Sequence, residues 1–328
     1  MLMPGIVGLG GVRFLQGIGS NVSPGLLPLE RATWLRAAAP ALVPDGSGFD
    51  GTNIFMPVIA RNLDRSPYQD GDGKYYQYYI ATSVEDRSGL ALGTDFDTWT
   101  RYSADPVLDL GLEGSPDWGD AQITSVYFDG TEFVGYYQGN ANGSGSGGDE
   151  VTVCQFTSAD GKTLTKQGIV LDRGPVGDAL DLYVPRLVPA GHDGLPRLYY
   201  TGQDASSVRG LMCAVSLSGN IRGPWTRLRD DHLYRDGSSF LGDAWYDADD
   251  ELYHILYSPL DTVRAIMYAT SEDGENFTLR RELVPRNIGE WDTNPFNAGF
   301  YELNGTWYIW FNSSSSIGNG YHYAVPPA

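Results

Sequence analysis

Short runs of aromatic and β-branched residues recur five times along the chain, each directly after a turn sequence. The runs cover residues 74–82, 132–139, 197–202, 251–258 and 306–313. Their starts lie roughly 45 to 65 residues apart, which is the spacing of blades in a β-propeller. The repeat therefore predicts an all-β fold built from five similar units.

Each run has an apolar strand before it and another after it. The preceding strands cover 54–59, 122–128, 182–188, 240–246 and 296–301, and the following strands cover 90–93, 151–154, 211–215, 265–269 and 321–324. Most turns between the first and second strands carry Asp-Gly or Asn-Gly, which suit tight hairpins because both central positions need a positive φ. A fourth strand follows, as at 98–102 and 277–281. The pattern predicts a five-bladed β-propeller of four-stranded antiparallel blades.

The fifth repeat shows no fourth strand before the sequence ends at Ala328. A matching strand stands near the other end, because residues 33–43 resemble the Trp-containing fourth strand of the first repeat. We predict that 33–43 pairs with 321–325 and closes the last blade. Such a closure removes the free sheet edge that an open array would leave.

Residues 1–30 are apolar and rich in glycine, and we expect them to form an arm separate from the propeller at 31–328. They lack the basic start and uninterrupted apolar core of a secretory signal. No apolar run reaches the roughly 18 residues of a membrane span. Two interpretations stay open: an arm packed on the propeller, or an anchor in a protein assembly such as a virion or a cell-surface appendage. An extracellular or virion-associated location is expected before a cytoplasmic one.

The amino-acid composition limits the kinds of partner and cofactor that we expect this protein to bind. The formal net charge is −19, which argues against nucleic acid and anionic membranes. Cys154 and Cys213 lie in apolar runs on third strands, so buried free thiols are expected rather than a disulfide or a metal site. No nucleotide-binding or nucleophile-elbow motif is present. No cofactor is indicated, although the acidic channel mouth leaves room for a single Ca²⁺ or Na⁺ ion.

The loops predict where a site lies. In a propeller, the first strand of each blade lines a central channel, and the loops that join blades gather with the loops between second and third strands on one face. Here these loops are long and carry carboxylates, amides and tryptophans, whereas the hairpins of the opposite face are short. Such groups suit carbohydrate, because carboxylates and amides hydrogen-bond neighbouring hydroxyls and tryptophans stack on sugar rings.

A glycosidase needs two carboxyl groups on either side of the scissile bond. The catalytic candidates are the acids closest to the starts of first strands, namely Asp120, Asp181 and Asp243. The substrate-binding candidates are Asp50, Asn53, Trp118, Asp178, Trp245, Trp291, Asp292 and Asn294.

The repeat resembles five-bladed glycosidases, namely the arabinanase and β-xylosidase family (family 43) and its invertase-like relatives. The resemblance covers roughly residues 33–325 and rests on the Asp-Gly-Lys-Tyr-Tyr-x-Tyr-Tyr run at 72–79 and the Ser-Glu-Asp-Gly turn at 271–274. It implies an Asp-Pro step with a catalytic base on the first inner strand and a second such step on the third blade. Here these steps read Met56-Pro57 and Val184-Pro185, and the family's Glu-x-Pro step has Gly242-Asp243-Ala244 as its nearest match.

Two functions therefore stay open. The chain is a glycoside-hydrolase-like propeller that binds and cuts a poly- or oligosaccharide, or it is a propeller without catalysis that recognises glycans or serves as part of an assembly.

Overall fold

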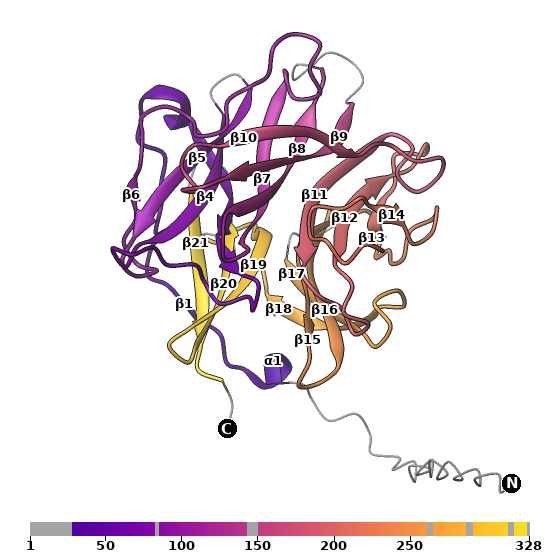
Figure 1. The fold of residues 1–328 in the computed structure, drawn as a ribbon. Helices are drawn as coiled ribbons and strands as arrows, with labels where there is room; N and C mark the ends of the chain where they lie inside the picture. The colour runs from indigo at the N-terminus through magenta and orange to yellow at the C-terminus, as the bar shows by residue number, and fades with distance from the viewer. Residues whose placement is uncertain are drawn as a thin grey trace, which may run out of the picture.

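The computed structural model describes residues 28–82, 85–142, 150–260, 265–286, 291–313 and 318–326, and in this part of the chain five β-sheets form a propeller (Figure 1). The first blade contains β2 (Asn53–Ile59), β4 (Tyr75–Thr82), β5 (Asp86–Gly93) and β6 (Thr100–Arg101). The second contains β7 (Asp120–Phe128), β8 (Phe133–Asn140), β9 (Val151–Ser158) and β10 (Thr165–Leu171), and the short β3 (Arg61–Asn62) joins it in parallel to β7.

The third blade contains β11 (Asp181–Val188), β12 (Arg197–Gln203), β13 (Arg209–Val215) and β14 (Thr226–Arg227). The fourth contains β15 (Ser239–Asp247), β16 (Leu252–Pro259), β17 (Ile266–Ser271) and β18 (Thr278–Val284). The fifth contains β19 (Phe296–Leu303), β20 (Thr306–Asn312), β21 (Asn319–Ala324) and β1 (Leu35–Arg36). The helical segments are the single turns α1 (Pro28–Arg31) and η1 (Gly48–Asp50), so the predicted all-β class is confirmed for the described residues.

The predicted closure of the fifth blade is also confirmed. β1 pairs antiparallel with β21, with Leu35 opposite Tyr323 and Arg36 opposite His322. Further along, Leu42 and Asn319 exchange backbone hydrogen bonds of 3.1 and 2.8 Å. The ladder between these two contacts is interrupted, and Pro40 in this stretch has no N–H to donate. The closing strand is therefore shorter than the predicted 33–43, but it covers the edge of β21.

Apolar side chains fill the spaces between neighbouring blades. Between the first and last blades, Tyr79 and Trp99 pack with Tyr301 and Trp310 in one buried cluster. Comparable clusters lie at the other four blade interfaces. Cys154 and Cys213 lie in these interfaces as buried free thiols, as predicted, and burial raises the pKa of Cys154 to about 11.

Tyrosines on the second strands join the first, second and third blades to the blade that follows each of them. The hydroxyl of Tyr78 donates to the Gly161 carbonyl at 2.6 Å, and that of Tyr199 donates to the Gly274 carbonyl at 2.8 Å. Both acceptors lie in Ser-x-Asp-Gly turns of the following blade, where the glycines have φ values of 68° and 76° that other residues rarely adopt. Tyr136 makes the same kind of contact with the Ile221 carbonyl.

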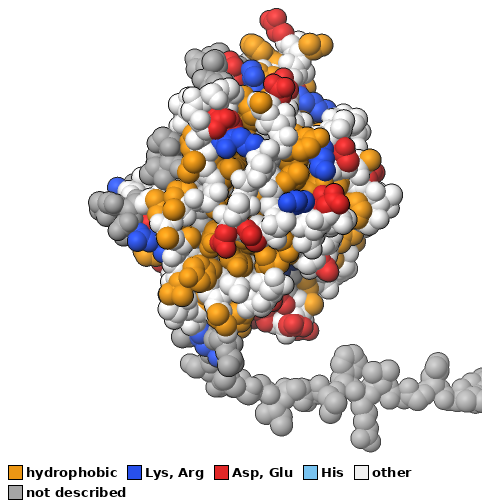
Figure 2. Space-filling model, turned by 90° about the vertical axis from the view of Figure 1, so that its left-hand side faces the viewer, with side chains coloured by type: hydrophobic (Ala, Val, Ile, Leu, Met, Phe, Trp, Pro, Cys, Tyr) orange, Lys and Arg blue, Asp and Glu red, His pale blue; other side chains and the backbone are white. Residues whose placement is uncertain are grey.

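The acidic composition does not produce a single-sign surface on the side of the molecule shown in Figure 2, where acidic and basic side chains are scattered among apolar and neutral ones. None of the described helices has the length and apolar character needed to cross a membrane. Of the predicted arm at 1–30, residues 1–27 lie outside the described residues. Within α1, Leu29 packs in the core beside Trp245, and the Glu30 carboxylate forms a 2.8 Å ion pair with Arg280.

Candidate functional site

A cavity of about 480 Å³ lies at the channel mouth, on the face where the sequence predicts the site. We call it the mouth pocket. Its lining combines aromatic rings, side-chain amides and a few small or apolar groups: Phe55, Met56, Gln122, Gln138, Tyr183, Val184, Phe240, Asn294, Phe296, Asn297, Asn312 and Ser313. No carboxyl group is among these lining residues. Among the described residues, the pocket wall therefore offers hydrogen bonds and ring faces to a ligand, but no charge from an acid.

One wall of the mouth pocket is aromatic. The ring centres of Tyr183 and Phe240 are 5.3 Å apart, and those of Phe240 and Phe296 are 5.4 Å apart. The guanidinium carbon of Arg209 lies 4.7 Å from the ring centres of both Tyr183 and Phe240. The arginine holds these two rings in place and brings a positive charge to this side of the pocket.

The first strands bulge where they form the pocket wall. Met56, Val184 and Asn297 have φ values of 49°, 50° and 51°, each at a register shift between the first and second strands. A β-branched residue such as Val184 seldom adopts a positive φ. Strain of this kind gathers at ligand sites, where the surrounding structure holds it. Two of these residues, Met56 and Val184, precede a proline and stand where the resembling family has the aspartates of its two Asp-Pro steps.

A chain of amide hydrogen bonds connects the pocket to a half-buried acid, Asp86. Gln138 Nε2 donates to Gln122 Oε1 at 2.6 Å, and Gln122 Nε2 donates to Asp86 Oδ2 at 2.6 Å. The backbone N–H of Val184 donates to Gln138 Oε1 at 2.9 Å. Each amide is therefore fixed in one orientation, and the arrangement links the first three blades behind the pocket wall.

Asp86 is a residue that sequence reasoning missed. Burial, together with the nearby charges of Asp120 and Glu85, raises its pKa to about 6, although a hydrogen bond from Thr82 opposes the shift. The backbone N–H of Asp86 donates to Asp120 Oδ1 at 2.9 Å, so the two acids are neighbours. No motif marks Asp86 in the sequence, because its role depends on the pairing of β5 with β4 and on its contact with the next blade.

Two of the three predicted catalytic acids lie beside the mouth pocket. Asp120 is the first residue of β7, two positions before Gln122, and Asn140 Nδ2 donates to its Oδ2 at 3.2 Å. Asp181 is the first residue of β11, two positions before Tyr183, whose hydroxyl donates to its Oδ2 at 3.0 Å. Because side chains two apart on a strand share a face, both acids point toward the pocket side of their blades. Both are buried, with 8% and 4% of their surfaces exposed.

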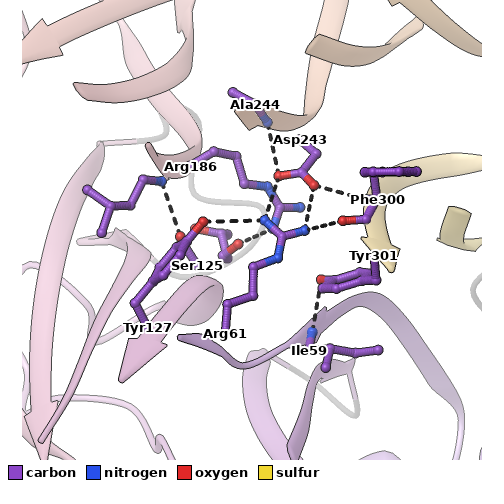
Figure 3. A network of polar contacts seen from close by, with 11 residues as sticks. Ile59, Arg61, Ser125, Tyr127, Arg186, Asp243, Ala244, Phe300 and Tyr301 are labelled. Carbon is purple, nitrogen blue, oxygen red and sulfur yellow. Dashed lines mark hydrogen bonds and ion pairs between the residues drawn. The ribbon is translucent and has the colours of Figure 1, made fainter. Parts of the chain in front are cut away.

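The third predicted catalytic acid, Asp243, lies deeper in the channel and outside the mouth pocket. It is 1% exposed, and Arg61 Nη1 and Nη2 donate to its oxygens at 3.2 and 2.6 Å (Figure 3). Burial opposes its ionisation, but the charge and hydrogen bonds of Arg61, the charge of Arg186 and the N–H of Phe300 together outweigh this and lower the pKa of Asp243. The Asp243 carboxylate therefore forms an ion pair with Arg61. It lies at the centre of the channel and not at the channel mouth.

Three predicted binding acids are used inside the blades instead of at the mouth. Asp50 accepts a hydrogen bond from the Tyr79 hydroxyl at 2.8 Å, and Asp178 accepts one from the Tyr200 hydroxyl at 2.7 Å. Each also forms an ion pair with an arginine of its own blade, as does Asp292. These three side chains are nearly inaccessible to solvent.

The pairing of such an acid with a tyrosine or a basic residue of its own blade recurs, and it explains why several blades carry an acid in the loop before their first strand. Asp117 accepts from the Tyr137 hydroxyl at 3.0 Å and pairs with Lys166, and in the fifth blade His322 Nε2 lies 2.8 Å from Asp292 Oδ2. An acid from the loop before the first strand therefore ties that loop to the second or third strand. The repeat that suggested a ligand site at these acids is a structural repeat within the blades.

Among the remaining binding candidates, only Asn294 lines the mouth pocket. The indole N–H of Trp291 donates to the Ala37 carbonyl at 3.0 Å, so this ring holds the closing segment. Trp245 stacks between His254 and Phe300 near the opposite face. Trp118 is half-buried and Asn53 begins β2, and neither belongs to the pocket lining.

A second cavity, of about 390 Å³, opens on the opposite face among the short hairpins. It contains Asp247, Asp250 and His254, whose potential ligand atoms lie within 4.8 Å of one another and could hold a metal ion. His254 also contacts the Tyr268 hydroxyl through Nδ1 at 2.7 Å. The Arg65 guanidinium, which lies over the Trp245 ring in the same cavity, adds a positive charge that disfavours a cation there.

No family model matches this chain, and no curated protein matches it in sequence. Solved structures do match. A family 117 glycoside hydrolase of the marine bacterium Zobellia galactanivorans aligns over 90% of each chain, with 16% identity and a TM-score of 0.63. An inulosucrase from Halalkalicoccus jeotgali, bound to kestose, aligns over 87% of this chain and 82% of its own, with 11% identity and a TM-score of 0.62.

A thermostable family 43 glycoside hydrolase covers 86% of this chain and 91% of its own, with 12% identity and a TM-score of 0.57. At such identities the likeness establishes the fold and leaves the chemistry to the site. The protein therefore has the five-bladed propeller fold of these glycoside hydrolases, as its sequence repeat predicts.

Proposed function

We propose that this protein is a carbohydrate-binding propeller that holds an uncharged part of a poly- or oligosaccharide in the mouth pocket. The observation that carries the proposal is the lining: side-chain amides and aromatic rings around about 480 Å³, with no carboxyl group among the lining residues that the structure describes. Amides donate and accept hydrogen bonds and so match sugar hydroxyls, while ring faces match the C–H faces of a pyranose. The related fold of glycoside hydrolases agrees with this ligand class.

Binding without cleavage is the favoured mode at this pocket. The steps at which the resembling family carries acids are Met56-Pro57 and Val184-Pro185 here, and Met56 and Val184 themselves form the wall. Neither side chain can donate a proton or act as a nucleophile. Asp243, the nearest match to the family's third acid, is committed to Arg61.

The test is a glycan array followed by calorimetric titration of the full chain. Gln138→Ala and Phe240→Ala should each weaken binding about 10- to 100-fold, because each removes about 1–3 kcal/mol of hydrogen bonding or ring contact. Leu217→Ala is the matched control, since Leu217 is 68% exposed in the turn between β13 and β14. Unchanged affinity in both pocket variants would place the ligand elsewhere.

The second candidate is hydrolysis of the bound glycan, and one observation favours it. Asp86 is an acid with a pKa of about 6 beside Asp120, and Asp181 lies beside the pocket at the start of β11. An acid with a raised pKa next to an ionised one is a pattern of glycosidases. The proposed proton donor is Asp86 or Asp120, and Asp181 would activate water or attack the anomeric carbon.

Arabinan, xylan, fructan and marine polysaccharides are the substrates to screen. If the protein is a hydrolase, Asp86→Asn, Asp120→Asn or Asp181→Asn should lower turnover at least about 100-fold, as expected when a general acid or base is lost. Turnover that survives all three substitutions would exclude these acids. Binding of a glycan that is never cut, under conditions that saturate the pocket, would favour the first proposal.

The proposal also covers the location of the protein and its attachment to a larger assembly. We propose a location outside the cytoplasm, on a virion or cell surface, with the part of the predicted 1–30 arm that precedes the buried Leu29 and Glu30 as the attachment segment. Support comes from the apolar, glycine-rich composition of these residues, which suits burial against a partner. The size of the native particle in the source material tests this, and a free monomer there would contradict it.

A further inference from the structure

The centre of the channel contains more positive than negative charge. Arg61 from β3, Arg186 from β11 and Asp243 from β15 converge there, and Figure 3 shows both guanidinium groups next to the one carboxylate. All three residues are at least 95% buried. Two arginines against one aspartate leave one positive charge in excess.

Asp243 is satisfied by Arg61 and by the backbone. Arg61 Nη2 donates to it at 2.6 Å, and the N–H groups of Ala244 and Phe300 donate to its two oxygens at 2.9 Å each. Arg61 also donates to the Phe300 carbonyl at 2.7 Å, and its guanidinium lies 4.3 Å from the Tyr301 ring centre. The charges of Arg61 and Asp243 therefore compensate each other, although Arg61 Nε has no hydrogen-bond partner among the described residues.

Arg186 is left without such compensation. Its Nη1 donates to the Thr124 carbonyl, but within the described part of the chain its Nε and Nη2 have no hydrogen-bond partner. The other charged groups nearby are Arg65 and Asp247 toward the hairpin face, which carry opposite charges. Burial lowers the pKa of Arg186, and the charge of Asp243 only partly offsets this. A buried charge with two unused donors is costly unless a partner of opposite charge occupies the site.

A small cavity lies at this position. It has a volume of about 10 Å³ and is lined by Arg61, Arg186 and Asp243 together with the hydroxyl-bearing residues Ser125, Tyr127 and Tyr301. Such a space is at the lower limit for one water molecule, so a chloride ion, which is larger, has to displace the surrounding side chains slightly. We propose that a single monatomic anion, chloride under ordinary salt conditions, binds there against Arg186 as a structural ion. The excess positive charge disfavours the Ca²⁺ or Na⁺ ion that the acidic sequence left open for the channel.

The experiment compares halide with non-halide salts on the full chain. Tm is measured by calorimetry in sodium chloride and sodium bromide series, balanced with sodium gluconate at constant ionic strength. A ligand that binds only the folded state raises Tm saturably, here by about 2–4 °C. Crystals grown in bromide should show an anomalous-scattering peak in the cavity between Arg186 and Ser125.

Arg186→Met removes the excess charge and should abolish the halide dependence. Arg222→Met is the matched control, because Arg222 pairs with Asp129 and Glu132 at the surface and its loss should leave the halide response intact. If the Arg186→Met substitution prevents folding, the bromide peak in the unmodified protein decides. Equal Tm values in chloride and gluconate, with water in place of a bromide peak, would overturn the proposal.

Discussion

The Asp86 carboxyl couples the mouth pocket to pH. Burial raises its pKa from 3.8 to about 6, so the folded state holds this proton more tightly than the unfolded state does. Stability contributed by the protonated form is present below pH 4 and is lost as the pH rises through about 6, at a cost of up to about 3 kcal/mol. When Asp86 ionises, the group that accepts the hydrogen bond from the Gln122 amide changes from a neutral carboxylic acid to a carboxylate.

Asp86→Asn tests this dependence. The variant should gain stability relative to the native protein as the pH rises from about 4 to about 7, because only the native protein has to ionise the half-buried Asp86 carboxyl. Urea unfolding at each pH measures the difference in unfolding free energy. Asparagine has only one side-chain oxygen, so it can accept from Thr82 or from Gln122 but not from both, and the lost hydrogen bond adds an offset to the difference. A difference that is flat across this range would contradict the raised pKa.

Aspartates that look alike in the sequence have different tasks in the fold. Asp178 and Asp181 are three positions apart, yet the first is tied to Tyr200 and Arg227 and the second lies beside the mouth pocket. Local composition cannot separate them. The distinction arises because the loop turns between Asp178 and Asp181, so that the two side chains meet different strands.

At the scale of the strand, paired tyrosines serve two interfaces at once. Successive side chains on a strand point to opposite faces, so Tyr199 reaches the next blade while Tyr200 contacts its own blade's acid. Tyr78 with Tyr79 and Tyr136 with Tyr137 repeat this division. The recurring aromatic run is therefore a packing device that holds neighbouring blades in register.

Tyr199→Phe should destabilise the protein by about 1–2 kcal/mol, because it leaves the buried Gly274 carbonyl without its donor. Tyr102→Phe is the control: Tyr102 is 47% exposed, and its substitution should change the unfolding free energy by less than about 0.5 kcal/mol. Chemical denaturation of both variants checks the pair. Equal stability of Tyr199→Phe and the native protein would show that the inter-blade bond contributes nothing.

Strand order was predictable from the sequence, whereas the pocket was predictable only in its location. Periodic apolar runs and Asp-Gly turns are local signals, and they suffice for the blades and for the closing segment near Leu35. The contact of Gln138 with Gln122 and Asp86 joins three separate stretches of chain, and nothing local marks it. The pairing of Asp243 with Arg61 across 182 positions is of the same kind.

At the scale of the molecule, the ring is closed by both backbone and side chains. β1 covers the edge of β21, and the indole of Trp291 holds the Ala37 carbonyl of the closing segment. Arg101 extends this contact to the first blade, since its Nη2 donates to the Val43 carbonyl at 2.6 Å. The segment from Leu35 to Val43 therefore touches the fifth and first blades together.

Two truncations separate this closing segment from the arm that precedes it. Removal of residues 1–45 takes away β1 and the Leu42 contact, which exposes the edge of β21 and leaves a gap in the cluster between the first and last blades. An exposed edge is a template for pairing with other chains, so this variant should aggregate. Removal of residues 1–27 keeps α1, Leu29 and the Glu30–Arg280 ion pair, and this variant should be monomeric with cooperative unfolding. Light scattering after size-exclusion chromatography, together with calorimetry, distinguishes the two. A chain that starts at residue 46 and stays monomeric and cooperative would show that the other four interfaces hold the ring without its backbone closure.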